Sequence, residues 1–96
     1  MSRTERRLKR KEGELDVTAF LKTADKFIDL ANRENAKVKA TQLHLAFLFA
    51  SARYSAFVGK NILDIDDHET FVEEMTNEYR DYLRQHLADE TIDPPK

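Results

Sequence analysis

The sequence contains no cysteine, and it has only two glycines and two prolines among its 96 residues. The lack of cysteine excludes a disulfide-bonded scaffold and a zinc site built on cysteines. So few turn-forming residues also argue against an all-β fold, which needs a turn every few residues. At 41% hydrophobic residues, the chain is too apolar for a disordered polymer. The composition therefore favours one small helical domain.

A long apolar run is also missing. The most apolar stretch, residues 43–58, contains His44 and Arg53 and is shorter than the ~20 residues of a membrane span. The basic start of the chain is not followed by the apolar region of a signal peptide. We therefore expect a cytoplasmic protein that has no membrane partner.

Charge is distributed unevenly along the chain, although the formal net charge is only −2. Residues 1–12 hold six basic and two acidic side chains, whereas residues 64–96 hold three basic and eleven acidic ones. A partner would therefore meet a basic end or an acidic end of the molecule.

Apolar residues recur at three- and four-residue intervals in three segments, which is typical of helices with one buried side. The sequence predicts an all-α fold, a small bundle of three principal helices at about 16–32, 41–58 and 67–88. As a domain organisation we expect a flexible basic tail at 1–13, one α-helical domain at 14–90 and a frayed C-terminus at 91–96.

Capping residues fit these predicted helices. Asp16 suits the first N-cap and Thr41 the second, because their side-chain oxygens can accept from free amides of the first turn. Gly59 is expected to stop the second helix, since glycine tolerates the left-handed conformation there. Asp66 or Asp67 can cap the third, and Asp66 has the capping-box spacing to Glu69.

The middle helix is apolar on nearly every side. Two amphipathic helices in a domain of this size leave part of such a helix uncovered. We therefore expect a second subunit to complete the fold, as a homodimer or a higher homo-oligomer.

Arg53 is the most unusual residue of the middle helix, because a charge among apolar side chains needs a partner or access to water. One interpretation is structural, with an ion pair to Asp29 or Glu78 or a side chain that reaches the edge of the helix. The other is a small anionic ligand site built by Arg53, Tyr54 and Asn32.

The basic tail offers a different kind of site. It carries Arg3, Arg6, Arg7, Lys9, Arg10 and Lys11. These side chains could bind nucleic-acid phosphates through charge, with a strong salt dependence. The alternative is a solvated tail, or one that folds back on the acidic third helix, which could also receive a protein partner.

Patterns for catalysis and for metal binding are weak. The run Asp64, Asp66 and His68 begins like a calcium loop, but Glu69 and Met75 stand where that loop needs glycine and glutamate. No nucleophile motif and no glycine-rich phosphate loop is present. We expect no metal, no cofactor and no enzymatic activity.

Three blocks of the sequence carry a family resemblance. They are Phe27-Ile28-Asp29-Leu30-Ala31-Asn32 with Glu34, Ala52-Arg53-Tyr54-Ser55-Ala56-Phe57, and Phe71 through Glu78-Tyr79-Arg80 with Leu83. Over roughly residues 24–90 the chain resembles a family of small bacterial proteins catalogued as a domain of unknown function. The resemblance implies a compact α-helical cytoplasmic protein and adds no mechanism.

These observations favour a non-enzymatic protein–protein interaction or structural module. Two alternatives stay open: a nucleic-acid-associated accessory protein that uses residues 3–11, and a binder of a small anionic ligand at Arg53.

Overall fold

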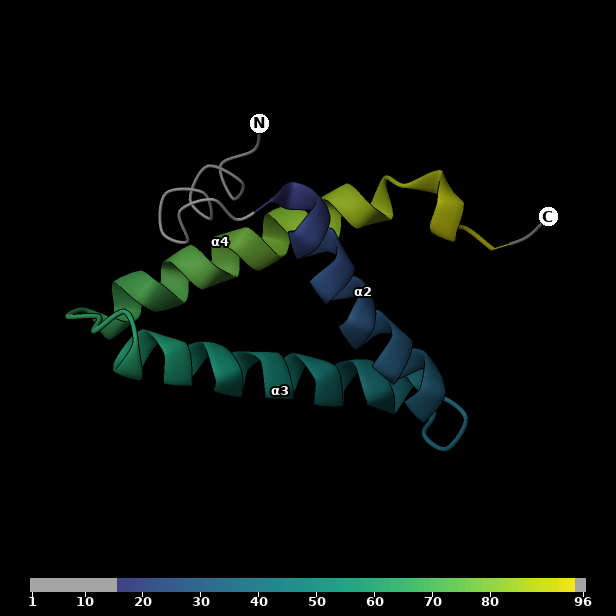
Figure 1. The fold of residues 1–96 in the computed structure, drawn as a ribbon, viewed down its shortest axis with the longest axis horizontal. Helices are drawn as coiled ribbons and strands as arrows, with labels where there is room; N and C mark the ends of the chain where they lie inside the picture. Colours follow the sequence, from purple (N-terminus) through teal and green to yellow (C-terminus); the bar gives the residue numbers. More distant parts are fainter. Residues whose placement is uncertain (1–15, 95–96) are drawn as a thin grey trace. The chain divides into compact units, whose positions relative to one another are not determined.

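The computed structural model describes residues 16–94, and every regular element in that range is helical. The elements are α2 (Val17–Glu34), α3 (Ala40–Asn61), α4 (His68–Leu87) and the short 3-10 helix η1 (Glu90–Ile92), shown in Figure 1. The prediction of an all-α fold with three principal helices is therefore confirmed. The chain divides into two units, residues 1–56 and 57–96, and the division falls within α3.

Helix α2 begins as the sequence predicts. The Thr18 amide donates to Asp16 Oδ1 at 2.9 Å, and Asp16 has the extended backbone of an N-cap. The helix ends at Glu34, two residues later than expected, because Asn35 still donates to the Ala31 carbonyl at 2.9 Å. Arg33 lies in this last turn, where a positive charge is favourable at the carboxyl end of the helix.

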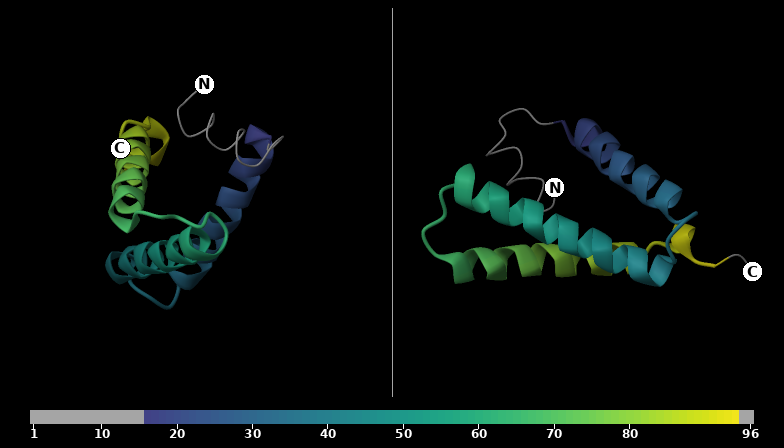
Figure 2. Two further views of the ribbon diagram at one scale, coloured as in Figure 1. Left: turned by 90° about the vertical axis from the view of Figure 1, so that its left-hand side faces the viewer. Right: turned by 90° about the horizontal axis from the view of Figure 1, so that it is seen from below.

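Helix α3 differs from the prediction at both ends. It starts at Ala40, so Thr41 lies inside the helix and is not its N-cap. It continues through Gly59 to Asn61, and the prediction that Gly59 ends the helix is wrong. Figure 2 shows α3 as one continuous helix. The left-handed residue after the helix is Asp64, with φ of 50°.

The physical reason for glycine at position 59 is packing. A Cβ built there would lie 2.9 Å from Phe71 Cε2 and 3.2 Å from Ile65 Cδ1, which is too close for an ordinary contact. The Ile65 amide donates to the Gly59 carbonyl at 3.1 Å. The connector and the first turn of α4 therefore pack directly on the backbone at Gly59, which is buried.

Helix α4 is capped by Asp67, the second of the two predicted candidates. Its Oδ1 accepts from the amides of Glu69 and Thr70 at 3.0 and 3.4 Å, and Thr70 Oγ1 donates to Oδ2 at 2.7 Å. The predicted capping box of Asp66 and Glu69 is wrong, because the capping carboxylate is one residue later and its side-chain partner is a threonine.

Large apolar side chains are widely exposed on these helices. In residues 16–94 no apolar side chain is fully buried, and seventeen large ones are exposed. They come from α2, α3 and α4 and from the segments around them. Burial of such surface is the main favourable term in folding and in association, so these side chains are the natural place to look for a binding surface.

None of the helices in the described range combines the length and the apolar run that crossing a membrane requires.

Candidate functional site

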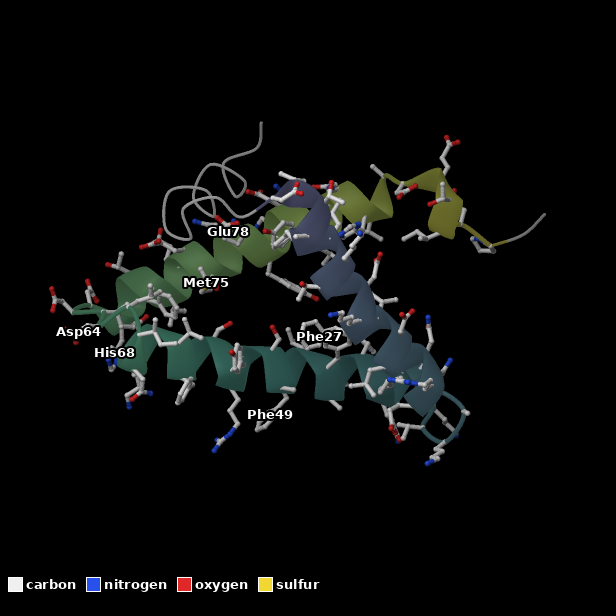
Figure 3. All side chains as sticks on the ribbon, in the orientation of Figure 1. Phe27, Phe49, Asp64, His68, Met75 and Glu78 are labelled. Carbon is white, nitrogen blue, oxygen red and sulfur yellow. The ribbon has the colours of Figure 1, made fainter. Side chains whose placement is uncertain are left out.

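Large apolar side chains are exposed around most of α3, at Leu45, Phe47, Leu48, Phe49, Tyr54 and Phe57. Leu45 and Phe49 are 57% and 72% exposed, and Ala52 and Ala56 follow at intervals of three and four residues. At about 100° per residue these four positions share one side. In Figure 3 the Phe49 side chain points away from the side of α3 on which Phe27 of α2 lies. We call Leu45, Phe49, Ala52 and Ala56 the α3 stripe.

Positive charge borders the α3 stripe. Arg53 follows Phe49 by one turn, and its side chain is exposed. Lys60 is the only other lysine or arginine of the helix, which contains no carboxylate. The sequence suggests Asp29 of α2 as a partner of Arg53. Within residues 16–56, these two side chains form no ion pair. Arg53 therefore presents its charge to solvent beside an apolar stripe.

The three residues of the predicted anionic-ligand site come from two helices. Arg53 and Tyr54 are adjacent on α3, and both are exposed. Asn32 lies in the last turns of α2, whereas Arg53 is thirteen residues into α3, about 20 Å along the helix axis. The ligand site stays a prediction, with Arg53 and Tyr54 as its neighbouring members. The six basic residues predicted for nucleic acid lie outside the described residues.

Helix α4 has two apolar sides where the sequence indicated one long stripe. Phe71, Met75 and Tyr82 are half-buried on one side. Val72, Tyr79, Leu83 and Leu87 are 52%, 50%, 44% and 70% exposed on another. We call these four exposed residues the α4 stripe. Glu69 and Glu73, both exposed, lie beside its amino-terminal half.

Glu78 is the buried carboxylate of α4. Its side chain is only 7% exposed and lies on the same side of the helix as Phe71 and Met75. Figure 3 labels Glu78 and Met75 on α4. The spacing could have revealed this, because Glu78 follows Phe71 by seven residues and Met75 by three.

Two aspartates have altered acidity. The Thr70 hydroxyl, with help from the Thr70 amide, lowers the pKa of Asp67 below its usual 3.8. The Thr91 amide and hydroxyl, at 2.9 and 2.8 Å, lower the pKa of Asp89 in the same way. Both are capping carboxylates, of α4 and of η1, so these pKa changes belong to local structure.

The described residues contain no cluster of potential metal ligands. Across residues 16–94, no group of three or more histidine, aspartate and glutamate side chains could hold a metal ion. Figure 3 shows Asp64 in the connector and His68 at the start of α4, the two ends of the calcium-like run.

The described residues thus define a helical protein with large apolar side chains exposed on all three of its principal helices. A family model described as "Protein of unknown function (DUF3144)" matches residues 20–91, three quarters of the chain, and the chain belongs to this family. The match covers all three blocks on which the sequence resemblance rests. No curated protein and no solved structure matches the chain.

Proposed function

We propose that this chain is a non-enzymatic, cytoplasmic protein-interaction module that associates with itself. The observation that supports the proposal is the set of seventeen exposed large apolar side chains in residues 16–94. Such surface is favourable to bury, at about 25 cal/mol per Å². Extended exposed apolar patches typically mark interaction surfaces.

The chemistry of the described residues supports binding more than catalysis. The stripes contain only apolar side chains, and the altered pKa values belong to helix caps. The polar groups beside the stripes, such as Arg53 and Glu73, suit the rim of a protein interface, where charges contribute to specificity.

Sedimentation velocity over a range of protein concentrations tests the proposal. We expect a mass above the 11.2 kDa of one chain, and a larger average mass at higher concentration if the association is reversible. A single species of monomer mass over the whole range would overturn self-association. Turnover of a small substrate by the purified chain would overturn the non-enzymatic assignment.

A further inference from the structure

We draw no further inference here: the strongest candidate, the surface patch of large apolar side chains exposed around α3 between Leu45 and Phe57, carries no proposal because nothing in the structure shows what covers it.

Discussion

Phe71 lies against the backbone of Gly59, so closely that a Cβ at position 59 would be 2.9 Å from Phe71 Cε2 and 3.1 Å from Cζ. Gly59 is inside α3, and Phe71 is in the first turn of α4. The pair fixes the local geometry of the connector, where the Ile65 amide also donates to the Gly59 carbonyl.

Substitution of Gly59 by alanine should therefore destabilise the protein. Alanine gains about 1 kcal/mol over glycine inside a helix, but forcing an atom into a packed site costs about 1–3 kcal/mol. We expect a net loss of up to about 2 kcal/mol in the free energy of unfolding, measured by urea denaturation. In a Phe71→Leu background the ring is gone, so Gly59→Ala should become neutral or stabilising. A loss of stability in both backgrounds would contradict this packing explanation.

Acidification should reduce the stabilisation that the N-cap Asp67 gives to the first turn of α4. Hydrogen bonds from Thr70 lower the pKa of Asp67 below 3.8, so the carboxylate stabilises the folded state above that pH. The stabilisation should decline as the pH falls below 3.8 and through the lower pKa of the folded state. Urea denaturation at a series of pH values measures the decline.

Asp67→Asn is the control for this titration. Asparagine is as good an N-cap as aspartate and does not ionise, so the variant should lose part of the pH dependence but keep its helix at neutral pH. Asp67→Ala should be less stable at neutral pH as well. Identical pH profiles for wild type and Asp67→Asn would show that other carboxylates account for the decline.

Removal of the Asp16 side chain, the N-cap of α2, should lower the free energy of unfolding. The carboxylate of Asp16 accepts the Thr18 amide at 2.9 Å, and loss of such a cap costs about 1 kcal/mol. Asp16→Ala should lower the free energy of unfolding by that amount, whereas Asp16→Asn should have little effect. Equal stability of the alanine and asparagine variants would contradict the capping role.

Replacement of Arg53 by methionine should leave the fold intact. The side chain is exposed, and surface substitutions usually change stability by less than about 0.5 kcal/mol. We expect an unfolding midpoint close to that of the wild type. A large loss of stability would instead support the structural interpretation of Arg53, and loss of thermal stabilisation by an anionic metabolite would support the ligand site.

Deletion of residues 1–12 should leave self-association unchanged, since the exposed apolar side chains that support it come from residues 16–94. The same deletion should abolish any salt-sensitive retention on nucleic acid, because it removes six basic side chains. Sedimentation velocity and nucleic-acid chromatography, run on both chains, measure the two effects. A deletion variant that no longer associates would show that residues 1–12 contribute to self-association.

The sequence by itself determined the helices, because the intervals between apolar residues and the capping aspartates are local properties of the chain. Asp16 and Asp67 cap the helices for which they were considered, and the family follows from residues 20–91. Self-association, the ligand site and the role of the basic residues stay predictions.

Only the tertiary structure decided that Gly59 is a packing position inside α3, and which side of α4 is buried. A glycine near the end of an apolar run is compatible both with a helix stop and with close packing, and the contact with Phe71 selects packing. The spacing puts Glu78 on the side of Phe71 and Met75, but only the structure decided that this side would be the buried one while Tyr79 and Leu87 stayed exposed. Burial depends on which neighbouring element lies on each side of a helix, and local spacing does not contain that information.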